Sequence, residues 1–134
     1  MNQKEDSIKL KLSKSKALLA EIETLMVHKY FTTVISRLYY SCFHATKALL
    51  LTKDLIPKTH SGVISLLHQH FVQSGSFEMN HAIFYSRLMQ ERIDDDYSDF
   101  MIISESEVLE FIQPAYEYVA YIENTIEQYL NRID

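Results

Sequence analysis

Four polar side chains with complementary chemistry lie close together in residues 30–51, YFTTVISRLYYSCFHATKALLL. At 100° per residue of a helix, Arg37, Tyr40, Ser41 and His44 gather on one face. Arg37 and His44 are seven residues apart, so along a helix they lie almost in line, about 10 Å from each other. An imidazole that titrates near neutrality can serve as base or acid, and a guanidinium stabilises negative charge that develops on a phosphate. These residues are therefore the first candidates for a functional site.

The opposite side of the same helix is apolar and would pack on a core. Its stripe consists of Ile35, Leu38, Tyr39, Cys42, Thr46 and Leu49. The pattern ends near Lys53, where Asp54 and Pro57 interrupt it. We therefore predict one long helix that buries one face and leaves the polar face free for a function.

Composition indicates one soluble domain. The chain has 134 residues, 47% of them hydrophobic and 23% charged, with only two Gly and two Pro, which favours long helices with few connections. The net charge of −5 disfavours a broad basic face, so any contact with nucleic acid would be local. The single cysteine, Cys42, allows no disulfide within the chain and is expected to be a small buried residue. We see no secretory signal and no apolar stretch of membrane-spanning length, so a cytoplasmic location is expected.

Helical periodicity continues along the rest of the chain. We predict helices over residues 6–27, 63–71, 78–93 and 104–130, the second capped by Thr59 or Ser61 and closed by Gly75. Ser104 and Glu107 form a capping box for the last helix, which should continue across Pro114. This pattern predicts a single all-α domain over residues 1–134, an up-and-down bundle of four main helices plus one short helix.

Other candidate sites have simpler alternatives. Lys58 and His60, at the start of the short helix, could hold an anion, although a capped helix start explains them as well. The lysines at positions 9, 11, 14 and 16 could meet phosphate or simply face solvent. Glu78-Met-Asn-His81 occurs once, where a di-iron bundle needs two copies, so no metal and no other cofactor is expected.

The ordered motifs resemble those of a known family. Ser36-Arg-Leu-Tyr-Tyr-Ser-Cys-Phe-His44 is similar to the Ser-Arg-x-Tyr-Tyr-x-x-Phe-His segment of bacterial and archaeal HEPN (higher eukaryote and prokaryote nucleotide-binding) domains. Lys58-Thr-His-Ser-Gly62, the region from Phe71 to Gly75 and Arg92-x-x-x-Asp96-Tyr97 follow in the expected order. The resemblance covers about residues 19–130.

This resemblance implies a helical bundle, usually a homodimer, often paired with a minimal nucleotidyltransferase in a toxin–antitoxin system. Active members are similar to metal-independent ribonucleases that carry an Arg, four to six residues and a His near the dimer seam. Arg37 and His44 fit that spacing. In many catalytic relatives the motif lies on a later helix, where this chain has Arg92 and, five residues on, Tyr97 instead of His. Both alignments remain open.

Two functions follow from these patterns. The preferred interpretation is a non-catalytic dimeric module that binds a nucleotide or an RNA end, or partners a nucleotidyltransferase. Its ligand-binding or phosphate-binding residues would be Tyr40, Ser41, Lys58, His60, Arg92 and Tyr97. The alternative is a ribonuclease toxin in which Arg37 and His44 are catalytic across a dimer interface. The resemblance also implies a third role, in which a partner adenylylates Tyr97 or Tyr40.

Overall fold

The chain folds into helices joined by short connections. The computed structural model describes residues 2–97 and 103–131, and the side chains of all of these except residues 95–97. The helices are α1 (Gln3–Leu19), α2 (Ile22–Val27), α3 (Phe31–Leu51), α4 (His60–Leu67), a π-helical turn (His68–Val72), α5 (Met79–Tyr97) and α6 (Glu105–Asn131). The described residues contain no strand, and the predicted all-α class is confirmed.

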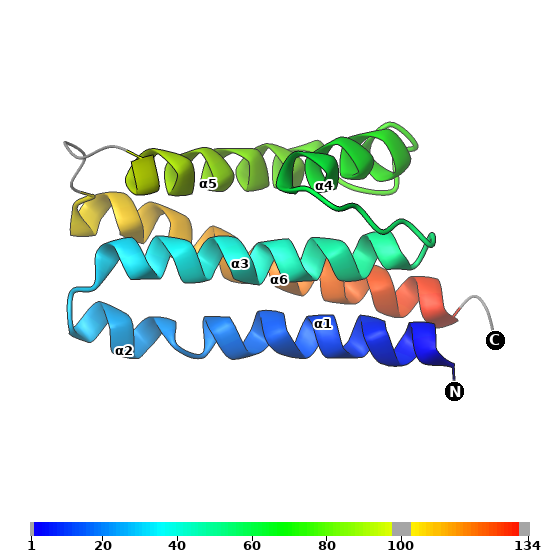
Figure 1. Cartoon of the computed structure of the whole chain (residues 1–134), viewed down its shortest axis with the longest axis horizontal. Helices are drawn as coiled ribbons and strands as arrows, with labels where there is room; N and C mark the ends of the chain where they lie inside the picture. Colours follow the sequence, from blue (N-terminus) through cyan, green and yellow to red (C-terminus); the bar gives the residue numbers. More distant parts are fainter. Residues whose placement is uncertain (1, 98–102, 132–134) are drawn as a thin grey trace.

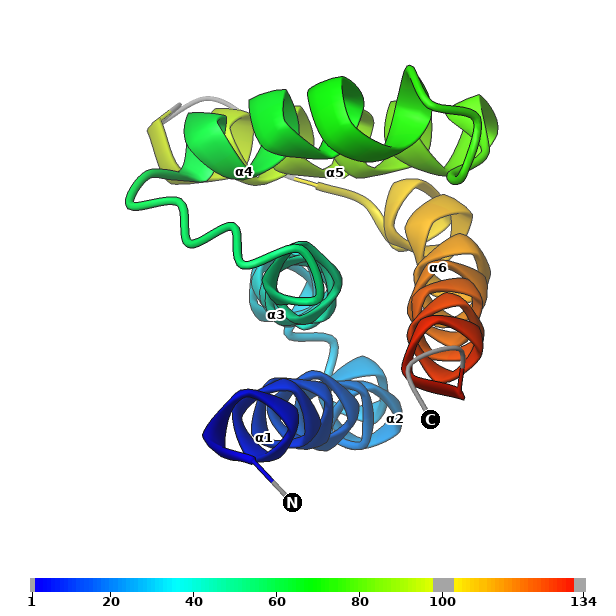
Figure 2. The ribbon, with the colours of Figure 1, turned by 90° about the vertical axis from the view of Figure 1, so that its right-hand side faces the viewer.

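The long helix α3 lies at the centre of the bundle. In Figure 1 it runs antiparallel to α1, with α4 and α5 on its other side and α6 behind it. Figure 2, along the bundle, shows α1, α6 and the α4–α5 layer around three sides of α3. Every residue of the predicted apolar stripe, from Ile35 to Leu49, is buried. The fourth side of α3 is consequently the one strip of this helix that solvent can reach.

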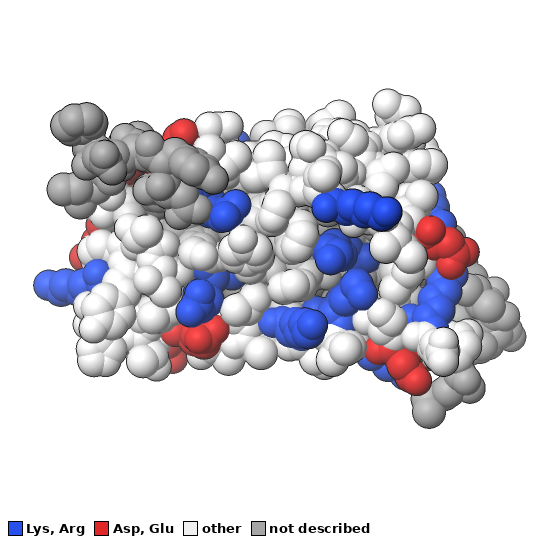
Figure 3. Space-filling view, viewed as in Figure 1, with Lys and Arg blue, Asp and Glu red and all other residues white. Residues whose placement is uncertain are grey.

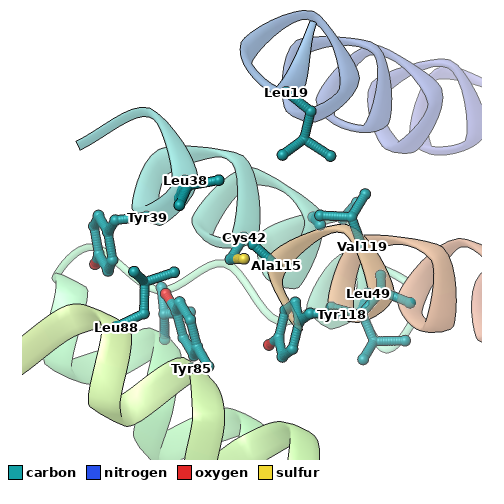
Figure 4. Packing of buried hydrophobic residues seen from close by; sticks show 14 of the residues in the cluster. Leu19, Leu38, Tyr39, Cys42, Leu49, Tyr85, Leu88, Ala115, Tyr118 and Val119 are labelled. Atoms are coloured by element: carbon teal, nitrogen blue, oxygen red, sulfur yellow. The ribbon is translucent and has the colours of Figure 1, made fainter. Parts of the chain in front are cut away.

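Three buried tyrosines connect α3 with α5 and α6 in the core (Figure 4). The ring of Tyr85 stacks between Tyr39, with centroids 5.9 Å apart, and Tyr118, at 5.5 Å. The Tyr118 hydroxyl lies 2.7 Å from Oγ1 of Thr46, so this buried polar group has a partner. Cys42 is buried as predicted, and burial raises the pKa of its thiol, which keeps it protonated and unreactive.

The predicted position of Ser41 on the exposed face is wrong. Ser41 is fully buried where α1 crosses α3. Its hydroxyl donates to the carbonyl oxygen of Ser15 at 2.8 Å, and the Ser15 hydroxyl donates to the carbonyl oxygen of Ser41 at 2.7 Å. The two hydroxyl oxygens are 3.0 Å apart. Small side chains here let two helices approach closely, and Ser41 has no surface left for a ligand.

The first predicted helix is divided in two. It starts earlier than predicted, at Gln3, because Oδ1 of Asn2 caps it by accepting the N–H of Glu5 at 2.7 Å. It ends at Leu19, and α2 resumes after a turn at residues 20–21. No Gly or Pro marks this break, and nothing in the local sequence explains it.

Helix α5 is longer than predicted. The prediction placed its end near Ile93. The helix instead continues to Tyr97. Nε2 of Gln90 donates to Oδ1 of Asp94 at 3.0 Å, one turn further on, and this bond supports the additional turn. The side chain of Asp96, in the Arg92-x-x-x-Asp96-Tyr97 motif, lies outside the described side chains.

The other helix boundaries agree with their predicted caps. Oγ1 of Thr59 accepts the N–H of Gly62 at 2.9 Å at the start of α4. Ser104 and Glu107 each accept the other's backbone N–H at 3.2 Å, which is the predicted capping box of α6. Helix α6 continues through Pro114, and Gly75 follows the π-helical turn with a φ of 81°.

Helix α2 ends with a residue in a strained backbone conformation. Lys29 has a φ of 61°, and the next N–H, that of Tyr30, donates to the carbonyl oxygen of Leu25. Glycine is the residue that normally occupies this position of a helix end. We expect Lys29→Gly to raise the free energy of unfolding by about 0.5–1 kcal/mol because the left-handed conformation costs glycine little. Urea denaturation measures this change in the free energy of unfolding. Ala17→Gly, at an exposed interior position of α1, is the control and should lower stability by about 1 kcal/mol.

Candidate anion-binding face

The exposed strip of α3 carries the predicted polar residues. Arg37, Tyr40 and His44 lie three and four residues apart, and Lys47 continues the same spacing. All four side chains are partly buried, because α1 and α5 flank the strip. Figure 3 shows this side of the molecule: Lys and Arg side chains recur across its middle, while acidic side chains are fewer and lie toward its borders. Cations therefore collect here although the whole chain is acidic.

Arg37 is paired with an acidic residue from the break between α1 and α2. Its Nε lies 3.3 Å from Oε2 of Glu21, and the two side chains are 38% and 48% exposed. Solvent screens so exposed a pair, so it adds little to stability. It does hold the guanidinium at the edge of the strip and offsets its charge. Arg37 and His44 therefore share a face, but the described contacts bring Arg37 to Glu21 rather than to His44.

A second group of residues meets around Tyr39 and Tyr40. The Tyr39 hydroxyl lies 2.6 Å from Nδ1 of His60, the first residue of α4. The imidazole also stacks on Phe43, with ring centroids 4.5 Å apart. From α5, the guanidinium carbon of Arg92 lies 5.2 Å and 5.1 Å from the ring centres of Tyr39 and Tyr40, within cation–π range. Three helices thus converge on one patch of aromatic and cationic groups.

Both histidines of this region are surrounded by positive charge. Burial, followed by the charges of Arg92 and Lys47, lowers the pKa of His60. Burial, followed by the charges of Lys47, Lys14 and Lys11, lowers the pKa of His44. Each imidazole is consequently neutral at pH 7, and each has room to gain a proton if an anion arrives.

Shallow depressions connect the strip to α1. One, of about 270 Å³, is lined by Lys14, Ala17, Leu18, Glu21 and His44. Another, of about 90 Å³, has Lys11 and Lys47 among its lining residues. Lys47 also covers the ring of Phe43, at 5.1 Å from its centre. We call the whole surface the cationic face; it comprises Lys11, Lys14, Arg37, Tyr40, Phe43, His44, Lys47, His60 and Arg92.

The two largest of the described hollows lie away from this face and are weaker candidates. One, of about 420 Å³, is lined by residues at the start of α1 and the end of α6, including Lys9 and its ion-pair partner Glu5. The other, of about 490 Å³, includes Lys53. That lysine already donates to the carbonyl oxygen of His70 at 2.5 Å and covers Phe71, so its charge is used within the fold. Size alone therefore does not mark the functional site.

The structure brings together some of the predicted residues and separates others. Tyr40, His60 and Arg92 meet in one cluster, whereas Ser41 is buried. Lys58 is exposed on the loop before α4. The side chain of Tyr97 lies outside the described part of the chain.

Sequence reasoning missed three residues of this region. Lys47 could have been found, because it follows His44 at the spacing that defined the face. Phe43 was quoted only as part of a motif, and its role as the stacking partner of His60 depends on where α4 begins. Nothing in the sequence pointed to Glu21, because its contact with Arg37 depends on the unpredicted helix break.

Among the described residues, no group of three His, Cys, Asp or Glu side chains could hold a metal ion. None of the described helices has the length and apolarity needed to cross a membrane.

Comparison with known proteins places the chain in a family. The family model described as HEPN domain matches residues 8–125. The chain belongs to the HEPN family. A UPF0332 protein of Thermotoga maritima is 30% identical over 127 residues, which cover 95% of this chain and 96% of that protein. The HEPN resemblance predicted from the sequence is therefore confirmed.

Two further HEPN relatives come from Methanocaldococcus jannaschii and are named Putative toxin MJ0142 and Putative toxin MJ0605. They are 30% and 36% identical to this chain over 72% and 60% of its length. The matched segments cover 65% and 60% of those two proteins.

Proposed function

We propose that this HEPN protein is a toxin-type, non-catalytic module that binds the phosphate of a nucleotide or an RNA end on its cationic face. The observation that carries the proposal is the convergence of His60 from α4 and Arg92 from α5 on Tyr39 and Tyr40 of α3. Lys47 adds a second positive charge, after that of Arg92, beside His60 in a chain whose net charge is −5. The names of the two archaeal relatives support the toxin-type role.

The chemistry of the cationic face suits a nucleotide better than a simple anion. A guanidinium offers several N–H donors to phosphate oxygens, and a lysine adds a point charge. Partly exposed aromatic rings such as Tyr40 and Phe43 offer a base a surface for stacking. The proposal is non-catalytic because Glu21 offsets the charge of Arg37 and because Arg92, the arginine on the later helix, is followed five residues on by Tyr97 and not by His.

A titration with AMP and adenosine tests this proposal. We expect AMP to shift the backbone amide resonances of α3 around Tyr40–Lys47 and of α4 around His60 in two-dimensional NMR spectra. Adenosine, which lacks the phosphate, should shift the same signals at least several-fold more weakly, because the cations bind the phosphate. Shifts of equal size with both ligands, or AMP shifts confined to other helices, would contradict the proposal.

Binding should depend on pH through His44 and His60. Their lowered pKa values leave both imidazoles neutral at pH 7, and a bound phosphate favours the charged form. Binding therefore takes up protons, and affinity should rise as the pH falls from 7.5 to 5.5. An oligoribonucleotide without a terminal phosphate is the appropriate ligand, because its diester phosphates do not titrate in this range. The double variant His44→Gln, His60→Gln should lose most of this dependence, whereas His28→Gln, on the exposed turn after α2, should retain it. An unchanged profile in the double variant would show that other groups take up the protons.

A ribonuclease toxin is the second candidate. Two relatives have toxin in their names, and Arg37 and His44 are both accessible on the same strip. If this function is correct, expression of the protein alone slows bacterial growth and His44→Ala restores growth while the circular dichroism spectrum stays unchanged. If the binding module is correct, cells that express the wild type and cells that express His44→Ala grow equally.

A further inference from the structure

We propose that the hollow of about 490 Å³ between α3, the π-helical turn and α6 binds a neutral sugar of hexose size. The hollow lies at the end of the bundle where α3 stops, on the right of Figure 1, and it shares no lining residue with the cationic face. This is a second site, for a ligand without a phosphate, and it does not depend on the proposed function.

The hollow has the size and the composition of a small-ligand site. Its volume falls within the roughly 300–1,000 Å³ of pockets that hold small molecules. Leu49 and Phe71, both buried in the core, supply the apolar part of its wall. Hydroxyl groups and the side chains of Gln128 and Tyr129 supply the polar part. Such sites typically combine an apolar lining with a few polar groups that orient the ligand.

The π-helical turn shapes one wall of the hollow. Single π-helical turns are rare and occur frequently at functional sites. Here the turn, His68–Val72, ends with the carbonyl oxygen of Phe71 directed to the segment that follows, where it accepts the N–H of Ser76 at 3.0 Å. Gly75, with a φ of 81°, lets the chain reverse at this point. The serines on both sides of this glycine are thereby held in the wall.

The hydroxyl groups of the wall have already donated their protons to the backbone. Thr52 donates to the carbonyl oxygen three residues earlier at 2.6 Å, and Thr125 to the one four residues earlier at 2.8 Å. The hydroxyl oxygens of Ser74 and Ser76 lie 3.1 and 3.2 Å from the carbonyl oxygen of Phe71 and 2.9 Å from each other. A hydroxyl that has donated its proton can still accept through its lone pairs. The wall consequently offers several acceptors to a ligand.

This arrangement disfavours charged ligands. Lys53 is the one charged residue among the described residues that line the hollow, and no carboxylate lines it. The Lys53 ammonium group donates to the carbonyl oxygen of His70 and lies 4.1 Å from the centre of the Phe71 ring. An anion would meet the lone pairs of the hydroxyl oxygens, and a cation would meet the ammonium group with no carboxylate to balance it. A neutral molecule that donates several hydrogen bonds fits this wall.

A hexose has this chemistry. Its hydroxyl groups can donate to the acceptor oxygens of the wall, and its C–H surfaces can pack on Leu49 and Phe71. The same hydroxyl groups can accept from the amide of Gln128 and the phenol of Tyr129. Displacing water from a polar hollow costs little affinity when the ligand reproduces the hydrogen bonds of the water. Planar amides and bases carry fewer donors per molecule than a hexose, and they match the wall less well.

The test is a titration of the whole protein with glucose, galactose and mannose, followed by two-dimensional NMR. We expect at least one of these hexoses to shift the backbone amide resonances of residues 52–53, 74–76 and 125–129. The dissociation constant should be about millimolar, the range expected for so small a ligand. If none of the three hexoses shifts these resonances, or if the shifts fall on Tyr40–Lys47 of the cationic face instead, the inference is overturned.

Charged derivatives of the hexose that binds test the selection of a neutral ligand. The uronic acid carries a carboxylate on the same ring, and the amino sugar carries an ammonium group. Both should bind at least several-fold more weakly than the neutral hexose. The affinity for the neutral hexose should stay constant between about 0.05 and 0.5 M salt, because salt screens only charges. Equal or tighter binding of either charged derivative would show that the hollow selects a charge, and the inference would be wrong.

Two variants locate the acceptor oxygens. Thr125→Val keeps the shape of the side chain and removes its oxygen, and Ser76→Ala removes the hydroxyl from an exposed turn. Each should weaken hexose binding about twofold to tenfold, the usual value of one hydrogen bond. Thr32→Val, exposed at the opposite end of α3, is the control and should bind like the wild type.

Circular dichroism shows whether the variants are folded, and Ser76→Ala provides the same test if Thr125→Val is not. Unchanged hexose affinity in the folded variants would overturn the inference. The proposed function stands or falls separately, because AMP and RNA are expected on the cationic face, which these substitutions do not touch.

Discussion

Lys47→Glu is expected to weaken binding of single-stranded RNA by about 100-fold at low salt. Lys47 lies between the two halves of the cationic face, since it lines a depression with Lys11 and covers Phe43. Charge reversal removes one phosphate contact and introduces repulsion of the next phosphate, and each contact carries a salt-dependent share of the affinity. Lys47→Ala, which only removes the charge, should have a smaller effect. Fluorescence anisotropy at several salt concentrations measures both.

Lys9→Glu is the matched control for this variant. It changes the net charge by the same amount, but Lys9 pairs with Glu5 away from the cationic face. Its affinity for RNA should stay within about threefold of wild type at 0.15 M salt, where charges beyond about 8 Å are screened. Equal losses in both variants would show that RNA responds to net charge alone and that the face has no special role.

Ser15→Leu is expected to lower the free energy of unfolding by about 2–5 kcal/mol. Ser15 is fully buried where α1 packs on α3, and its hydroxyl exchanges hydrogen bonds with Ser41. A leucine cannot fit this close crossing without displacing α1, and it removes the hydroxyl that donates to the carbonyl oxygen of Ser41. The loss is large compared with a typical domain stability of about 5–15 kcal/mol. Urea denaturation at an unchanged m-value gives the difference.

Ser13→Leu places the same side chain at an exposed position of the same helix. It should change stability by no more than about 0.5 kcal/mol. Ser15→Ala should have an intermediate effect, because it removes the hydroxyl that donates to the Ser41 carbonyl oxygen without overfilling the contact. A Ser15→Leu variant as stable as Ser13→Leu would show that α1 does not pack tightly on α3 at this point.

Most of the fold could be predicted because helical periodicity and caps are local signals. The apolar stripe of α3, the Thr59 cap and the capping box at Ser104 all depend on residues within one or two turns of each other, and the structure confirms them. The break at residues 20–21 could not be predicted, because neither residue disfavours a helix. It depends on how α1 and α2 pack against α3, which local spacing does not describe.

The candidate site was predictable only along single helices. The spacing on α3 placed Arg37, Tyr40 and His44 on one side, and all three are accessible there. The same 100° rule misplaced Ser41, because a face of 180° on a helical wheel is wider than the strip that remains between two packed neighbours. The meeting of His60 with Tyr39, and of Arg92 with Tyr40, joins residues that are 21 and 52 positions apart, and only the tertiary structure reveals it.

The reciprocal serine bonds also fix the register of α1 along α3. A slide of one helical turn, about 5.4 Å, would separate Ser15 from Ser41 and leave two buried hydroxyls unsatisfied. Lys11 and Lys14 lie within one turn of Ser15, so this pair also determines how far they stand from His44 and Lys47 on the neighbouring helix. A contact buried from solvent thus sets the spacing of charges on the surface. A variant that shifts this contact should misalign the cations without altering any of them.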